Sequence, residues 1–248
     1  MLSNHETLNF AYGDEVIEFE VNANLGDNSK ISIKVTPDCK VQVFTPLDIE
    51  YTQLMHAVKK RSRWIYQQLR VFREQTQLIT PRQYVSGESH YYLGKQYQLK
   101  VIESTEEIQG VKLLRGKLQV TLRKKETNKV KDLLAQWYRV RAKEVFAKRI
   151  TSMIDQALWV STTPNLRLLN MQTQWGNCSP TGMLTLNPYL VKAPTQCIDY
   201  VILHELCHLA EHNHSERFYY LMSQVMPDWE KRKNYLDGMA VRIFNDVV

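Results

Sequence analysis

The chain has 248 residues, a hydrophobic share of 44%, a charged share of 23% and a formal net charge of +6. This composition is that of an ordinary globular protein with room for one large domain or two smaller ones. No apolar run approaches the roughly 20 residues that span a bilayer. The first residues, MLSNHETLNF, also lack the basic start and apolar core of a signal peptide. We therefore expect a cytoplasmic protein that does not enter a membrane.

The cysteine content agrees with that location. The sequence has four cysteines and no CxxC pair. This spacing argues against a disulfide framework and against a zinc site made of cysteines alone. Disulfides and structural thiolate sites are therefore not expected to hold this fold.

The first part of the chain is rich in short alternating segments. In VIEFEV, residues 16–21, every second residue is apolar, which predicts a half-buried strand. Residues 31–35 and 41–44 flank the turn-like sequence TPDCK and predict a hairpin. A helical stretch follows from Pro46 to about residue 74. Its expected inner face consists of Leu54, Val58, Ile65 and Leu69.

More strands are predicted before the texture changes near residue 125. They lie in residues 91–103, 111–116 and 117–122, and Gly94, Gly110 and Gly116 mark turns. We therefore divide the chain into a β-rich N-terminal region, residues 1–125, and a second domain, residues 126–248. The sequence shows no internal repeat.

The second domain is expected to begin with a long amphipathic helix. Its apolar positions near helical spacing are Val130, Leu133, Leu134, Trp137, Val140 and Phe146. A break follows at residues 162–165, and residues 171–187 predict a strand, a turn and a second strand. The last part of the chain is helical and is interrupted at Pro227.

Positive charge is concentrated in residues 123–149, which hold ten Lys and Arg against three Asp and Glu. A solvated face of the long helix is the favoured interpretation, because no nucleic-acid-binding motif accompanies the run. A surface for nucleic acid or another acidic partner is the alternative. Both interpretations stay open at the level of sequence.

Four of the seven histidines lie in LHELCHLAEHNHS, residues 203–215. Because an α-helix has 3.6 residues per turn, His204 and His208 lie one turn apart on one face and can reach a single ion. Glu205 lies at the edge of that face, close enough to take a proton from a water at the metal without displacing a ligand. This is the arrangement of an H-E-x-x-H helix.

The segment that carries this motif is predicted to be buried, since apolar residues surround it in DYVILHELCHLA. Polar groups on a buried helix need partners, and a metal supplies them. Neutral imidazoles suit Zn²⁺, and three protein ligands plus water form an open catalytic site. We therefore predict one zinc ion per chain and favour it over a set of hydrogen-bonded core histidines.

Two histidines compete to be the third ligand. His212 continues the helical stripe, but about 12 Å of helix separates it from His204, too far for both side chains to share an ion. His214 can reach the metal if the chain turns back after Ala210. Asn213 tolerates the left-handed conformation that such a turn needs. His214 is therefore the expected ligand.

The segment HELCHLAEHNHSERFYYL resembles the signature of the YgjP-like predicted zinc metallopeptidases, HELxHxxxxxHSxxF. The resemblance extends to MQTQWGNCSPTGMLTLNPYLVKAP, to PDWEKRKNYL and to RSRWIYQQL, so it covers most of the chain. It implies an α+β protein with a zincin-like catalytic domain behind a β-rich N-terminal region. By this resemblance His204, His208 and His214 bind zinc, and Glu205 is the general base.

The same histidine spacing occurs in metzincins and in Wss-type and Spartan-type proteases, which act on DNA–protein crosslinks. Glu211 replaces the metzincin glycine, and no Met-turn is evident, so a true metzincin is not expected. The chain also departs from the MKTRWGSC pattern of its relatives at Gln172, Gln174 and Asn177. A substrate-gripping role for basic side chains at these positions is therefore not carried over.

Candidate substrate-binding residues lie in two places. Trp175, Gly176 and Asn177 are expected in an edge strand that aligns an extended peptide, although an aromatic packed at a turn is an equal alternative. Tyr219 is a candidate for binding substrate or stabilising the oxyanion. Further oxyanion candidates are Arg217, Tyr220 and Tyr235. The sequence does not choose among the four, and for each of them a packing role is favoured over an oxyanion role.

The sequence thus predicts a zinc-dependent metallopeptidase that acts on a protein or peptide substrate. Three alternatives remain. A zinc hydrolase of a non-peptide amide would need a closed pocket in place of a groove. A DNA-associated protease acting in crosslink repair would use the basic run at residues 123–149. A scaffold in which zinc only holds the fold is disfavoured by Glu205, because a structural site needs no base.

Overall fold

The structure, a computed structural model, describes residues 6–23, 31–36, 38–46, 49–77, 82–171, 174–179 and 181–244. It is α+β, as predicted. Its contacts divide the chain into two compact units, residues 1–80 and 81–248. The change in sequence pattern near residue 125 lies inside the second unit, between the last strand of a sheet and a long helix. It does not coincide with the division between the units.

The first unit is a four-stranded sheet with two helices. Its strands are β1 (Glu6–Tyr12), β2 (Glu15–Ala23), β3 (Ser32–Val35) and β4 (Val41–Thr45), in the order β1-β2-β4-β3. The alternation in residues 16–21 is confirmed, because Ile17, Phe19 and Val21 are all buried. The predicted hairpin is also confirmed, since β3 and β4 pair antiparallel.

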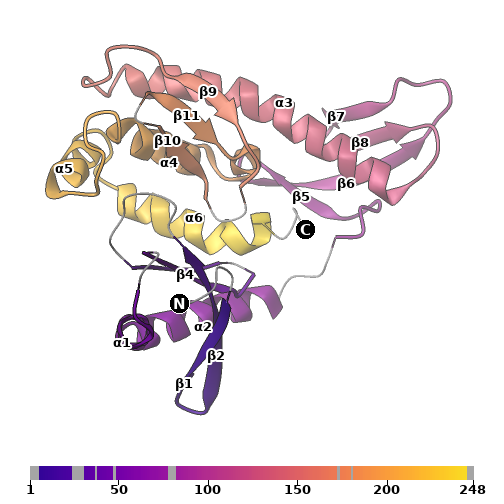
Figure 1. The fold of residues 1–248 in the computed structure, drawn as a ribbon. Helices are drawn as coiled ribbons and strands as arrows, with labels where there is room; N and C mark the ends of the chain where they lie inside the picture. The colour runs from indigo at the N-terminus through magenta and orange to yellow at the C-terminus, as the bar shows by residue number, and fades with distance from the viewer. Residues whose placement is uncertain are drawn as a thin grey trace. The chain divides into compact units, whose positions relative to one another are not determined.

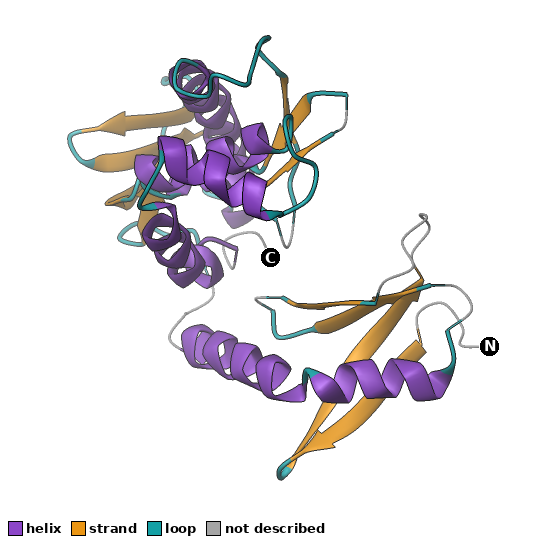
Figure 2. Ribbon diagram, turned by 90° about the vertical axis from the view of Figure 1, so that its left-hand side faces the viewer, coloured by secondary structure: helices purple, strands orange, loops and turns teal. Residues whose placement is uncertain are grey.

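The predicted helical stretch forms two helices, α1 (Tyr51–Lys60) and α2 (Ser62–Gln77), which follow each other end to end (Figure 2). The sequence analysis did not predict the interruption at Arg61. The predicted inner face is nevertheless correct, because its four apolar side chains all lie in the core of this unit. The helical period therefore continues across the break.

The second unit begins with a sheet of the same topology. Its strands are β5 (Ser89–Tyr92), β6 (Lys95–Glu103), β7 (Gly110–Leu114) and β8 (Lys117–Leu122), in the order β5-β6-β8-β7. In both sheets two antiparallel hairpins meet through a parallel pair of inner strands, and a helix follows. The chain therefore contains a repeat of topology, although its sequence shows none.

The long helix α3 (Thr127–Ile154) lies beside this sheet and continues along the smaller sheet of the unit (Figure 1). Its buried stripe consists of Val130, Leu134, Trp137, Tyr138, Ala142, Phe146, Ile150 and Met153. The prediction that Val140 packs inward is wrong, since this side chain is 53% exposed. At about 100° per residue, Val140 lies about 160° around the helix from Tyr138 and from Ala142, which are both buried, so it falls on the solvent face.

The remaining elements build the part of the unit that carries the histidines. They are β9 (Asn165–Leu168), β10 (Gly176–Cys178), β11 (Met183–Leu186), η1 (Pro188–Lys192), α4 (Thr195–Cys207), α5 (Glu216–Val225) and α6 (Trp229–Phe244). The sheet order is β10-β11-β9, so β10 is an edge strand. The predicted strand–turn–strand and the break at Pro227 are confirmed, whereas β9 was not predicted. No helix in the described ranges is long and apolar enough to cross a membrane.

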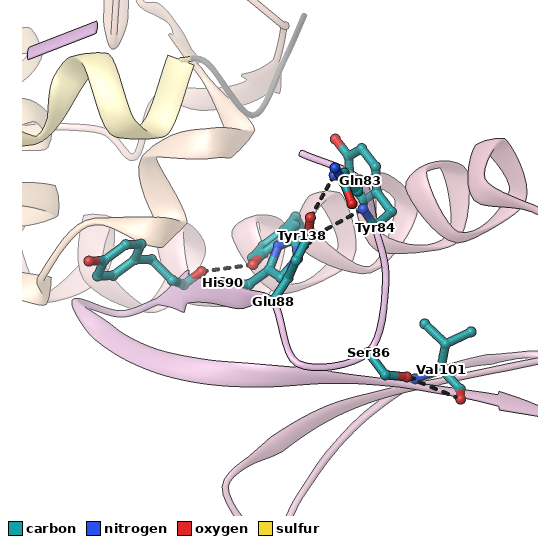
Figure 3. A network of polar contacts seen from close by, with 8 residues as sticks. Gln83, Tyr84, Ser86, Glu88, His90, Val101 and Tyr138 are labelled. Carbon is teal, nitrogen blue, oxygen red and sulfur yellow. Dashed lines mark hydrogen bonds and ion pairs between the residues drawn. The ribbon is translucent and has the colours of Figure 1, made fainter. Parts of the chain in front are cut away.

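A polar network holds the start of β5 in place (Figure 3). The Glu88 carboxylate accepts hydrogen bonds from the backbone N–H groups of Gln83 and Tyr84 at 2.6 and 2.9 Å. Its oxygen also lies 3.4 Å from Nε2 of His90, which is buried. The Tyr138 hydroxyl of α3 donates to the carbonyl of Tyr91 at 2.8 Å. This last bond joins β5 to α3.

The turn between β5 and β6 fixes the beginning of α4. The backbone N–H groups of Leu93 and Gly94 donate to the carbonyls of Val191 and Lys192 at 2.9 and 3.0 Å. Gly94 has a φ of +76°, and a Cβ there would lie 2.7 Å from Cγ of Pro194, the residue before α4. Only glycine suits such a left-handed, close approach, so this turn anchors the helix that carries the histidines.

Candidate active site

The histidine segment changes direction at the end of α4. Its last helical residue is Cys207, and His208 is the C-cap. Short-range bonds tighten residues 208–210, where the N–H of His208 donates to the carbonyl of Glu205. Ser215 then caps α5 by accepting a hydrogen bond from the N–H of Phe218 at 3.3 Å. The chain therefore turns back between α4 and α5.

This turn brings three histidines together. One ring nitrogen of His204, one of His208 and one of His214 all lie within 4.8 Å of one another. The Nε2 atoms of His204 and His214 are 3.0 Å apart. His212 is exposed and is not part of the group. Because α4 ends at Cys207, His212 does not continue the helical stripe of His204 and His208.

Phe218 packs against the three histidines of the cluster. Its ring centroid lies 4.9 Å from that of His204 and 4.8 Å from those of His208 and His214. The side chain is fully buried. A single aromatic ring thus packs against all three imidazoles and restricts their rotation. The sequence analysis assigned this residue no role, although the HSxxF pattern contains it.

Burial favours the neutral form of two of these imidazoles, those of His204 and His214. Burial, followed by the charges of His214 and His208, lowers the pKa of His204 to about 3. Burial also lowers the pKa of His214. Nδ1 of His208 lies 3.2 Å from the carbonyl oxygen of Glu211, and a proton on Nδ1 leaves the lone pair on Nε2. Converging neutral imidazole nitrogens are the donors that fit Zn²⁺.

Glu205 lies beside the histidines in a buried position, with only 6% of its surface exposed. Burial raises the pKa of its carboxyl to about 7, and a hydrogen bond from the backbone N–H of Cys178 acts in the opposite direction. A carboxyl with a pKa near neutrality suits general acid–base chemistry. A divalent cation nearby would favour its charged form.

Gly176 leaves the space that Glu205 occupies. A Cβ at Gly176 would lie 2.8 Å from Oε1, 2.9 Å from Cγ and 3.1 Å from Cδ of Glu205. The backbone φ of Gly176 is not in the left-handed region, so glycine is required here for space and not for backbone conformation. The absence of a side chain at Gly176 is therefore needed for the position of the carboxylate.

We expect Gly176→Ala to lower the rate of the hydrolysis that the sequence predicts by about 100-fold, because a shift of about 1 Å in a catalytic group has that effect. Metal binding should persist, since the three atoms nearest to the added methyl all belong to Glu205 and not to a histidine. Gly238→Ala is the matched control, because a Cβ there meets nothing within 4 Å. Both rates and the metal content would be measured on purified protein. Equal rates for the two variants would contradict the steric role of Gly176.

The strand β10 presents its outer edge to α4. The carbonyl of Trp175 accepts from Asn187 at 2.8 Å, and the N–H of Ser179 donates to Met183 at 2.9 Å. Since backbone groups alternate along a strand, Gly176 and Cys178 face away from β11. The hydrogen bond from Cys178 to Glu205 agrees with that direction. The exposed side chain of Asn177 lies between these two residues.

Asn187 holds the segment before β10. Its side chain is fully buried, and its Nδ2 donates to the carbonyls of Met171 and Gln174 at 2.7 and 3.2 Å. Its Oδ1 accepts from the N–H of Tyr189 at 3.1 Å. The ring of Trp175 stacks on Phe244 of α6 at 4.3 Å. The sequence analysis did not identify Asn187, and Gln172 lies outside the described residues.

Two hollows adjoin the histidine cluster and share Tyr200 and His204. The first, about 240 Å³, is also lined by Gln174, Trp175, Gly176, Val201 and Glu205. The second, about 490 Å³, is also lined by His214, Tyr219, Trp229, Glu230, Lys233 and Asn234. Together they flank the cluster on two sides. Tyr200, one turn before His204 on α4, was missed from the sequence.

The lining of these hollows distinguishes among the four candidate oxyanion donors. Tyr219 lines the second hollow, and its ring stacks against His214 at 6.3 Å. Tyr220 and Tyr235 are exposed and line neither hollow, and the same holds for Arg217. Tyr219 is therefore the member of that set that the structure places at the cluster.

Of the two cysteines near the site, Cys207 is buried and Cys178 is half-buried. Burial raises the pKa of Cys178 to about 11 and that of Cys207 to about 12. The Cys178 thiol donates to the carbonyl of Ser179 at 3.7 Å. Neither cysteine belongs to the ligand group formed by the three histidines.

Several cations of the basic run on α3 have partners within the protein. Arg149 forms two hydrogen bonds with the carboxylate of Asp199 on α4, at 2.6 and 2.7 Å. Arg139 donates to the carbonyl of Leu168, and Arg141 pairs with Glu144. Arg139 and Arg149 secure α3 to its surroundings, whereas the pair of Arg141 and Glu144 lies within the helix. The solvated face therefore remains the favoured interpretation of this run.

Comparison with known proteins gives one match over most of the chain. A family model described as "YgjP-like, metallopeptidase domain" matches residues 29–239. No curated protein matches the chain. Among solved structures, the metallopeptidase zymogen abylysin of Pyrococcus abyssi is 21% identical with a TM-score of 0.35. The zymogen jannalysin of Methanocaldococcus jannaschii is 20% identical with a TM-score of 0.32. Each match covers 39% of this chain and 93% of the other.

Proposed function

The chain belongs to the YgjP-like metallopeptidase family, and we propose that it hydrolyses peptide bonds with one zinc ion held by His204, His208 and His214. The observation that carries the proposal is the convergence of three histidine ring nitrogens within 4.8 Å beside a buried glutamate. Three imidazoles leave a fourth position open, as catalytic zinc sites do.

When bound, zinc would lower the pKa of a water molecule and polarise the scissile carbonyl. Glu205 would take the proton from the attacking water and pass it to the leaving amine. Its burial favours this exchange, since the carboxyl can hold or release a proton near neutral pH. Phe218 and the Glu211 carbonyl would keep the imidazoles oriented throughout.

The substrate would lie along the outer edge of β10. Gly176 offers outward backbone groups to an extended peptide, which would add a strand antiparallel or parallel to β10. Trp175 lines the hollow on one side of the cluster, Asn177 projects from the same edge, and Tyr219 lines the hollow on the other side. Two hollows flanking the cluster favour an extended peptide over a small amide. A cytoplasmic location stays a prediction.

Metal analysis combined with a peptide-cleavage assay tests this function. We expect about one equivalent of zinc per chain by elemental analysis and cleavage of members of a peptide library. Chelation should abolish cleavage, and added zinc should restore it, because the ligands are neutral imidazoles that rebind the ion. Full cleavage by metal-free protein would refute the mechanism. Zinc binding without cleavage of any peptide would point to the non-peptide amide alternative.

A further inference from the structure

A second surface, in the first unit, combines an exposed aromatic ring with three cations that have no ion-pair partner among the described residues. It is a hollow of about 390 Å³ at the junction of α1 and α2, lined by Lys60, Arg61, Arg63, Trp64 and Gln67. We call these five residues the junction hollow. All of them are exposed, and none takes part in the core of the first unit.

No acidic residue lies near the junction hollow in the sequence. No Asp or Glu occurs from residue 51 to residue 73. Further along α2, Arg70 pairs with Glu74 and Arg73 pairs with Glu15. By contrast, the described part of the chain offers no ion-pair partner to the three cations of the hollow. The hollow therefore attracts an anion.

The position of Trp64 is unusual for so large an apolar side chain. It is 41% exposed, while the next residue, Ile65, is fully buried in the core. Lys60 and Arg61 precede Trp64 by about one helical turn, and Gln67 follows it by one turn. The indole thus lies between cations on one side and an amide on the other. Lysines at the end of α1 also stabilise that helix, but this does not explain Arg63 or Trp64.

We propose that the junction hollow binds single-stranded nucleic acid, with a base stacked on Trp64 and phosphates paired with Lys60, Arg61 and Arg63. Aromatic platforms beside a cationic groove are how proteins bind single strands with little sequence preference. The Gln67 amide can donate to and accept from a base edge. This surface belongs to the first unit and the basic run on α3 belongs to the second. The proposal does not depend on the peptidase function.

An anionic membrane is a weaker candidate for the same surface. A helix that lies in the membrane interface inserts an apolar face among the lipids. The apolar face of α1 and α2 is instead occupied by the core, through Leu54, Val58, Ile65 and Leu69. A concave site with one aromatic ring fits an unstacked base better than a flat bilayer. An acidic peptide would satisfy the cations but gain little from the indole.

The test is fluorescence anisotropy of the full chain with fluorescein-labelled dodecamers of dT and of U at low salt. We expect binding whose affinity falls with a log–log salt slope of about −2, as three phosphate contacts on a single strand require. Trp64→Ala should weaken binding about tenfold, within the range of base–aromatic stacking. Trp64→Phe should retain most of the affinity, because it keeps a ring. The double variant R61E/R63E should abolish binding.

The matched control is K143E/K148E, which reverses two exposed charges on α3 and makes the same change in net charge. This variant should bind like the unchanged protein. Equal losses for R61E/R63E and K143E/K148E would overturn the proposal in favour of general charge attraction. So would an unchanged affinity in Trp64→Ala, or stronger binding to polyglutamate or to phosphatidylserine vesicles than to the oligonucleotides. Peptide cleavage should not change in any of these variants. A failure of the nucleic-acid proposal can therefore be distinguished from a failure of the proposed peptidase function.

Discussion

Glu205→Gln is expected to lower peptide hydrolysis by about 10²- to 10⁴-fold, the usual contribution of a general base. The amide keeps the shape of the side chain and can still accept the hydrogen bond from the backbone of Cys178, but it cannot take a proton at neutral pH. Because Gly176 leaves space for a side chain of this size, the variant should fold normally. Steady-state cleavage of a peptide found in the library screen measures the effect.

Measuring the metal content distinguishes loss of the general base from loss of the zinc ion. The glutamine variant should hold as much zinc as the unchanged protein, since no ligand is altered. Glu211→Gln is the control, because Glu211 contributes its backbone carbonyl and not its carboxylate to His208. It should cleave at nearly the native rate. A native rate in Glu205→Gln would show that another group acts as the base.

His214→Ala is expected to reduce zinc affinity by more than the 10- to 100-fold that loss of an outer-shell partner costs. The substitution removes one of three converging nitrogens, and the two imidazoles that remain form a weak site. Hydrolysis should be lost together with the metal. Zinc per chain, measured by elemental analysis after dialysis against a mild chelator, gives the result.

His212→Ala is the matched control for that experiment. His212 is exposed and lies outside the cluster, so its loss should leave zinc bound and change stability by about 0.5 kcal/mol or less. The two variants differ by two positions in sequence and remove the same side chain. Zinc loss from His212→Ala but not from His214→Ala would mean that the turn after α4 differs from the one described.

Much of the local structure could be predicted from the sequence, because it depends on short-range periodicity. The alternation around Phe19 predicted a strand, and the spacing from Leu54 to Leu69 predicted a buried helical face, which the core of the first unit confirms. The spacing of His204 and His208 placed both on one turn of helix for the same reason. The prediction that Val140 packs inward was wrong, because an apolar residue near the right spacing can still lie on the solvent face.

Other features depended on contacts between residues far apart in the chain. Nothing near Gly176 in the sequence indicates that Glu205 lies against it, and nothing near Asn187 indicates that it binds the carbonyls of Met171 and Gln174. The equal topology of the two four-stranded sheets was likewise hidden, because strand pairing is not encoded in a local pattern.

The sequence by itself thus determined the α+β class, the buried helical faces and the residues with metal-binding chemistry, because side-chain type and helical period are local properties. Only the tertiary structure decided that Phe218 packs on all three imidazoles and that Tyr200 is shared by two hollows. It also left Trp64 uncovered beside three cations. These arrangements depend on how separate elements pack in three dimensions, and no single segment contains that information.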